Sequence, residues 1–269
     1  MTARRYGLWI GLAILLVLAV MVVTPGLFTG GDPNGTDLHA VLVPPSGSHL
    51  LGTDQNGRDL YARLVYGARP SLLIGVGAVA IALVGGALIG LAAALGGRLV
   101  DQLLSRLLEV LLSVPGLLLV FLLVAVLGRG TGPAVLGLAV VALPGFARVA
   151  RAEVVGMRHR PYIEAAYGFG LRHAQVVVRH VLPNALSPVL SLGVVSLGAT
   201  IVASSSLSFV GLGPQPPTAE WGAMLAGSRD LLGLAWWTAV FPGAAVAVAV
   251  LAVSVVGRHV QQILDRRQR

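Results

Sequence analysis

Long stretches without a charged residue alternate with short polar segments along this chain of 269 residues. A helix that crosses the hydrocarbon core of a bilayer needs about 20 mostly apolar residues. The charge-free stretches predict six transmembrane helices, at roughly 8–28, 71–96, 106–127, 132–149, 187–212 and 235–257. Charged residues make up 11% of the chain, whereas soluble domains contain about 25%. The predicted fold class is therefore all-α integral membrane.

The distribution of arginine predicts the side of the membrane on which each loop lies. All 19 basic residues are arginine, and with the N-terminus inside, fourteen fall in inner segments and five in outer segments. Because cytoplasmic loops are enriched in positive charge, we expect both termini and the loop after the fourth span to be cytoplasmic. The first apolar run, Leu8 to Val23, is too long for a signal peptide and lacks an A-x-A-like cleavage site, which favours an uncleaved anchor in the cell (inner) membrane.

Several absences limit the chemistry of the chain. Lysine is missing, so no P-loop of the chain's own can bind ATP, because the GxxxxGK[ST] loop uses its lysine to reach the phosphates. The predicted spans contain no Asp, Glu, Arg or His at mid-depth, whereas proton relays and membrane haem sites use such residues. Cysteine is absent too, and we predict no catalytic residue, cofactor or metal site. The energy for any transport would have to come from another protein.

Two stripes of small residues each have two interpretations. The second predicted span has a small residue at every fourth position: Ala82, Gly86, Gly90 and Ala94. This ridge lets another helix approach closely, either within the chain or from a second subunit. The fifth predicted span has a hydroxyl at every fourth position: Ser196, Thr200, Ser204 and Ser208. These hydroxyls either line a translocation path or bond to backbone carbonyls inside the membrane.

Two polar segments between spans are predicted to lie outside. The segment 52–67 predicts a short amphipathic helix at the interface, with Asp59 and Arg63 as an i,i+4 ion pair. The segment 211–229 predicts a proline-rich turn and a short helix with Thr218 as its N-cap.

The stretch YIEAAYGFGLRHAQVVVRHVLPN follows the fourth predicted span and is a polar, arginine-containing segment between long apolar runs. Pro161 suits the first turn of a helix, and Gly168 and Gly170 suit its end. A second helix is predicted to end at Pro183, and Pro188 to start the fifth span. The pattern fits either an ordinary amphipathic surface loop or a rigid element that transmits a push to the spans.

This stretch also contains the spacing of a known motif. Six residues match EAA-x3-G-x9-I-x-LP, the EAA motif: Glu164, Ala165, Ala166, Gly170, Leu182 and Pro183. His180 stands at the isoleucine position. Two further segments, LGTDQNGRDLYARLVYGARPSL (51–72) and LSFVGLGPQPPTAEWGAML (207–225), look like signatures of the same family. The chain therefore resembles permease subunits of ABC importers, specifically the second permease of dipeptide, oligopeptide and nickel importers.

The resemblance implies a type I ABC importer permease fold with a cytoplasmic coupling helix. Residues 1–70 would form the first span and an extracytoplasmic segment, and residues 71–269 the permease core, with the EAA loop at about 150–185. The implied function is to form half of a pathway for di- and oligopeptides. The implied partners are a homologous second permease, two ABC ATPase subunits that bind ATP and Mg, a substrate-binding protein and membrane lipid, without nucleic acid.

The resemblance also assigns roles to residues. Those implied to couple the chain to the ATPases are Tyr162, Glu164, Ala165, Ala166, Gly168, Gly170, Leu182 and Pro183. Glu164 would pair with the ATPase surface, the two alanines would allow close approach, and Gly170 would make the turn. Related permeases often carry a glutamate before LSF, where this chain has serines. Alternatives are transport of nickel complexes or glutathione, or a stand-alone secondary transporter or channel, which would call for intramembrane charge or inverted repeats.

Overall fold

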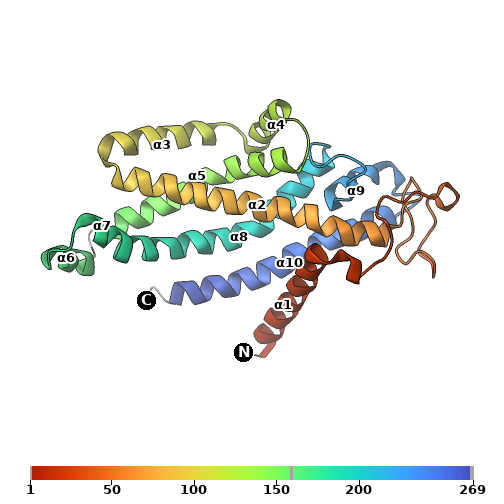
Figure 1. Cartoon of the computed structure of the whole chain (residues 1–269), viewed down its shortest axis with the longest axis horizontal. Coiled ribbons are helices and arrows are strands. Elements are labelled where there is room, and N and C mark those ends of the chain that lie inside the picture. Colours follow the sequence, from red (N-terminus) through yellow and green to blue (C-terminus); the bar gives the residue numbers. More distant parts are fainter. Residues whose placement is uncertain (1, 158–159, 267–269) are drawn as a thin grey trace.

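The computed structural model describes residues 2–157 and 160–266, so residues 158 and 159 of the predicted EAA loop lie outside the description. The described α-helices are α1 (Thr2–Val23), α2 (Leu60–Leu95), α3 (Gly97–Ser113), α4 (Gly116–Leu127), α5 (Thr131–Met157), α6 (Pro161–Gly168), α7 (His173–Val176), α8 (Leu182–Phe209), α9 (Trp221–Gly227) and α10 (Trp237–Arg266). Long helices form one bundle, with α6 and α7 at one end and α9 at the other (Figure 1). We call these the α6 end and the α9 end.

The described part of the chain is helical without a named strand, which confirms the predicted all-α fold class. Five helical segments are long and apolar enough to cross a membrane, and the pair α3–α4 makes a sixth if it counts as one broken span. Several helices extend past the predicted bounds: α5 continues to Met157 and α10 to Arg266. Backbone hydrogen bonding does not stop where the apolar run stops, so hydropathy underestimates helix length.

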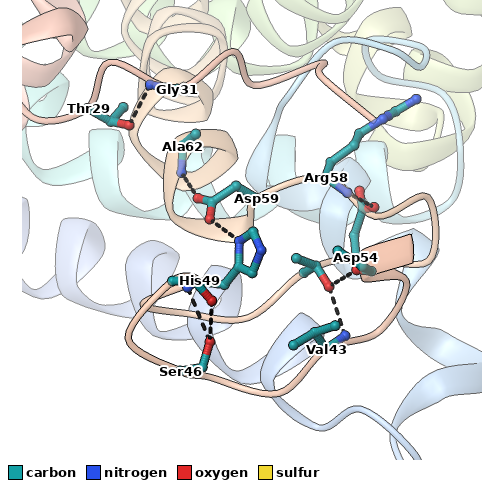
Figure 2. A network of polar contacts seen from close by, with 12 residues as sticks. Thr29, Gly31, Val43, Ser46, His49, Asp54, Arg58, Asp59 and Ala62 are labelled. Carbon is teal, nitrogen blue, oxygen red and sulfur yellow. Dashed lines mark hydrogen bonds and ion pairs between the residues drawn. The ribbon is translucent and has the colours of Figure 1, made fainter. Parts of the chain in front are cut away.

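Helix α2 has 36 residues and includes the second half, residues 60–67, of the segment 52–67 that was predicted to form a separate interfacial helix. Asp59 caps α2 by accepting a hydrogen bond from the Ala62 amide at 2.9 Å, and its other oxygen lies 3.0 Å from His49 Nδ1 (Figure 2). The predicted Asp59–Arg63 pair is therefore wrong. Arg63 is buried, and its Nε lies 3.5 Å from Asp54. An N-cap carboxylate turns towards the free amides of the first turn and away from the i+4 side chain.

Helices α2 and α5 pack closely along the small residues of α2. A Cβ atom on Gly86 would lie 2.5 Å from the Cβ of Phe146, and one on Gly90 would lie 2.7 Å from the Cβ of Ala150. Ala82 and Ala94 are buried on the same side. The ridge thus serves packing within the chain, which confirms the first of its two interpretations.

The predicted third span, 106–127, is wrong in its bounds and its continuity. Helix α3 already begins at Gly97 and returns beside α2, and α4 follows at an angle of 93° (Figure 1). Val114 is extended and Pro115 is the N-cap of α4, so the helical ladder breaks between them. The expectation of spans without charge at mid-depth does not hold for α3, because its start at Gly97 moves Arg106 and Glu109 from the first turn of the predicted span into the interior of the helix.

The predicted break between the second cytoplasmic helix and the fifth span is also wrong. The chain is helical from His173 to Phe209, with a π-helical turn at Val177–Val181 between α7 and α8. Pro183 lies in the first turn of α8, where a missing amide proton does least harm. The Asn184 side-chain amide donates to the carbonyl of His180 at 2.7 Å, which compensates for part of the disturbed ladder.

At the α9 end, the cap of α9 differs from the prediction. Glu220 and not Thr218 is the N-cap, and its carboxylate accepts hydrogen bonds from the amides of Gly222 and Ala223 at 3.0 and 2.8 Å. The Ser71 hydroxyl of α2 also donates to this carboxylate at 3.0 Å. Glu220 is fully buried, so α9 is fastened to α2 by a charge-assisted network.

Candidate functional site

Helix α6 stands at the far end of the bundle and is held by one apolar face. Pro161 begins the helix, and Ile163 and Ala166 are buried against Val154, Val176 and other residues of a cluster at the α6 end. The predicted role of Ala166 in approaching a partner does not fit this placement, because its methyl group faces the chain itself. Ala165, by contrast, is exposed.

The end of α6 is a sharp turn that depends on Gly170. Gly170 has φ +79°, a left-handed conformation that glycine adopts without strain. The amide of Gly170 donates to the carbonyl of Tyr167 at 2.9 Å, and the amide of Leu171 donates to the carbonyl of Ala166 at 3.2 Å. These two bonds form a Schellman motif. Gly168 is still helical, so of the two predicted turn glycines only Gly170 makes the turn.

The exposed surface of α6 carries aromatic rings and one carboxylate. Tyr162 and Glu164 are exposed, and the side chain of Phe169 is 88% exposed. Glu164 has no hydrogen-bond or ion-pair partner among the described residues. Aromatic residues are enriched in the surfaces through which proteins bind one another. Phe169 is an aromatic residue between two glycines, and it ends the stretch Tyr162 to Phe169 that the resemblance implies for the ATPase groove, although it was not among the residues assigned a role there.

Helix α6 is linked directly to the helix that continues into α8. The Tyr167 hydroxyl lies 2.7 Å from His173 Nδ1, and the two rings are stacked with centroids 6.1 Å apart. Behind this pair lies a cavity of about 340 Å³ that is also lined by Ile163 and Val181. Because His173 begins α7, this pair joins α6 to the first turn of the long helix His173–Phe209.

Leu182 and Pro183 lie at the start of α8, one helical segment away from α6. Leu182 is half-buried and Pro183 is exposed. They therefore lie where α8 leaves the π-helical turn. The exposed surface of α6, in contrast, is formed by residues 162–169 and includes neither of them.

The hydroxyl stripe of α8 points mainly into the chain. Ser196, Thr200 and Ser204 donate to carbonyls of their own helix at 2.8 to 3.2 Å. Ser204 and Ser208 are buried, and the Ser208 hydroxyl has no partner among the described residues. The geometry agrees with the packing interpretation, and a role of the stripe in translocation stays a prediction.

The comparisons with known proteins decide the class. Residues 70–269 match the family model described as "Binding-protein-dependent transport system inner membrane component". The chain belongs to this family. This permease is 39% identical to the "Probable D,D-dipeptide transport system permease protein DdpC" of Escherichia coli (strain K12), over 94% of this chain and 84% of the relative. It is 36% identical to the "Dipeptide transport system permease protein DppC" of Alkalihalophilus pseudofirmus, over 97% of this chain and 86% of the relative.

The fold of the permease is also found in solved transporters. A structure titled as the inward-facing MetNI methionine ABC transporter matches with a TM-score of 0.62 at 18% identity, over 75% of this chain and 96% of that one. This likeness shows that the fold is that of a type I ABC importer permease, as the motifs predicted. The protein is thus a multi-pass membrane component of a transporter, and such components work with ATPase and binding-protein partners in general.

Proposed function

We propose that this permease forms half of the translocation pathway of an ABC importer for short peptides, as the motifs predicted. A homologous second permease would form the other half, and two separate ATPase subunits would bind ATP and Mg and hydrolyse the nucleotide. A binding protein outside would deliver the peptide. The two relatives named for dipeptides, each aligned over more than nine-tenths of this chain, support the substrate class.

Helix α6 is the element through which the ATPases would act. Its rigid Schellman end, its buried Ile163 and the Tyr167–His173 contact fix it to the rest of the permease. The helix from His173 to Phe209 has 37 residues, which corresponds to roughly 55 Å at 1.5 Å per residue. A push on α6 would therefore tilt a rod that extends the whole depth of the membrane. This attachment of an exposed docking helix to one continuous rod is the observation that carries the proposal.

The proposed orientation places the α6 end and both termini in the cytoplasm. Arginine supports it, because fourteen of the 19 basic residues then lie inside. The α9 end and segment 28–59 would face the binding protein. A reporter enzyme that works only outside the cytoplasm can be fused after Gly168. Activity of this fusion would contradict the proposed orientation.

The coupling role is tested with Gly170→Val and Glu164→Arg in the complete transporter. Valine at φ +79° is strained, and arginine reverses the charge of the docking surface. Both variants should insert into the membrane at wild-type levels, retain less than about a tenth of the ATPase on affinity purification, and fail to take up labelled dipeptide. Gly156→Ala is the matched control, because an added Cβ meets nothing within 4 Å there and φ is not positive.

The outcome separates the parts of the proposal. Wild-type uptake in both variants would remove the coupling role of α6. Failure of the wild-type transporter to take up dipeptide, with uptake of a nickel complex or glutathione instead, would replace the substrate class and leave the coupling role intact.

A further inference from the structure

Helix α3 has two exposed flanks of opposite character. Four polar residues lie at positions i, i+4, i+7 and i+11 on one flank, and we call them the polar strip: Gln102, Arg106, Glu109 and Ser113. This spacing keeps residues on one side of a helix. Leu103 and Val110 lie on the other flank and are 72% and 63% exposed, whereas Leu108 faces the chain and is buried.

The polar strip lies at membrane depth. Helix α3 starts directly after α2 ends and runs back beside it (Figure 1), where α2 is free of charge from Ser71 to Leu95. Along α3, Arg106 and Glu109 are roughly 14 and 18 Å from Gly97, at about 1.5 Å per residue. The hydrocarbon core is about 30 Å thick. The two charges therefore lie close to its middle.

A helix flank that carries charged side chains cannot face lipid without a cost in free energy. Each charged side chain at the centre of a helix costs about 2.5–3.5 kcal/mol on insertion scales. Arg106 and Glu109 pair with each other at 2.8 Å, but their side chains remain 82% and 53% exposed. The apolar flank with Leu103 is suited to lipid, so the strip must face water or protein. Polar groups kept at this depth generally belong to a solute or ion path.

From this geometry we infer that the polar strip of α3 lines the aqueous path and contacts the charged ends of the peptide. The inference rests on the proposed function and adds the surface along which the solute moves. A free peptide carries an ammonium group at one end and a carboxylate at the other. Glu109 complements the first and Arg106 the second, and because the pair has no net charge it offers both contacts without trapping either ion.

The strip differs from the hydroxyl stripe of α8 in its exposure. Ser204 and Ser208 of α8 are buried within the chain, whereas all four residues of the strip are open. The ion pair Arg151–Asp101, with Nε–Oδ1 at 2.5 Å, ties the first turns of α3 to α5. This ion pair fixes the orientation of α3, so that the polar strip faces away from α5.

The test uses the absence of cysteine from the chain. Single cysteines are introduced at Gln102 and Ser113 of the strip, and at Leu103 and Val110 of the apolar flank as matched controls on the same helix. The complete transporter in membrane vesicles is then treated with a charged, water-soluble thiol reagent, and labelling of this subunit is followed. Strip cysteines should react at least about tenfold faster than the controls. An excess of alanyl-alanine, with binding protein and ATP present, should slow the reaction of the strip cysteines severalfold.

Two results would overturn the inference. If the strip cysteines react no faster than the Leu103 and Val110 controls, the flank lies against the second permease or lipid. If they react fast but alanyl-alanine gives no protection, the flank is wet but does not touch the solute. Uptake of alanyl-alanine by the unmodified transporter is measured in the same vesicles. Loss of that uptake would count against the proposed peptide function and not against the placement of α3.

Discussion

A Cβ atom added to Gly86 of α2 would lie 2.5 Å from the Cβ of Phe146 in α5. Real Cβ atoms do not come this close, so the distance between the two helices is set by the absence of a side chain at residue 86. The contact lies near the middle of α5 and in the second half of α2. The association of the two helices thus depends on van der Waals packing. Burial of apolar surface contributes little free energy to it, because lipid is as apolar as the helix surface.

Gly86→Leu should therefore destabilise the permease strongly. Overpacking of a tight core costs about 1–3 kcal/mol and more where backbone must move. The melting temperature of the purified transporter should fall by several degrees, at about 2–4 °C per kcal/mol. Gly77→Ala is the control on the same helix, because its Cβ would lie 3.4 Å from Val135 Cγ1, an ordinary contact. Equal melting temperatures for both variants would contradict the packing argument.

Glu220→Ala should release α9 from α2. The change leaves the amides of Gly222 and Ala223 and the Ser71 hydroxyl without their acceptor in a buried place, and each such orphan costs about 1–3 kcal/mol. We expect a lower melting temperature and faster proteolysis between α8 and α10, with Glu220→Gln intermediate because it keeps one acceptor.

A double-mutant cycle with Ser71→Ala separates the network from simple loss of the cap. Ser71 also accepts the amide of Trp221 at 2.9 Å, so the two residues belong to one network. Their coupling free energy should be about 0.5–3 kcal/mol. Additive effects of Ser71→Ala and Glu220→Ala would mean that α9 is held by other contacts.

Arg151→Lys should loosen α3. Arg151 binds both carboxylate oxygens of Asp101, at 2.5 and 2.6 Å, and lysine cannot reproduce this bidentate geometry. Because both side chains are partly exposed, we expect a loss of only about 1 kcal/mol, seen as faster hydrogen exchange in the first turns of α3. The control is Arg98→Gln, which changes an exposed arginine of α3 and should leave hydrogen exchange in α3 unchanged. The same acceleration in both variants would contradict a specific role of the Arg151–Asp101 pair.

Thr53→Val tests the segment before α2. The Thr53 hydroxyl donates to the carbonyl of Ala40 at 2.5 Å and accepts the amide of Val43 at 2.8 Å, and the side chain is fully buried. Valine has the same shape but leaves both backbone groups unpaired, at about 1–3 kcal/mol. Limited proteolysis from the α9 side should cut segment 28–59 faster. Thr36→Val is the control, because Thr36 is exposed, and an equal effect there would contradict the role of Thr53.

The coupling segment was largely predictable because its signals are local. Pro161 at the start of α6 and Gly170 at its end act through the backbone of a few neighbouring residues, so spacing in the sequence is enough. Which residues of the segment reach outwards was not predictable in the same way. Ala165 and Ala166 are adjacent and identical, yet one is exposed and the other is buried under α6, because the direction of the helix is set by the cluster beneath it.

The sequence alone determined that the chain is a bundle of membrane-spanning helices with an EAA-type loop, because apolar length and motif spacing are properties of the chain itself. Tertiary structure decided where helices continue and where they break. Leu60–Leu95 is one helix although its first turns are polar, and the predicted third span bends by 93° at Pro115. Pro115 permits the bend and Asp59 caps the start of α2, but hydropathy records neither, and packing against neighbouring helices such as α5 adds to both. That same packing turns the polar flank of α3 outwards, and no count of apolar residues contains this information.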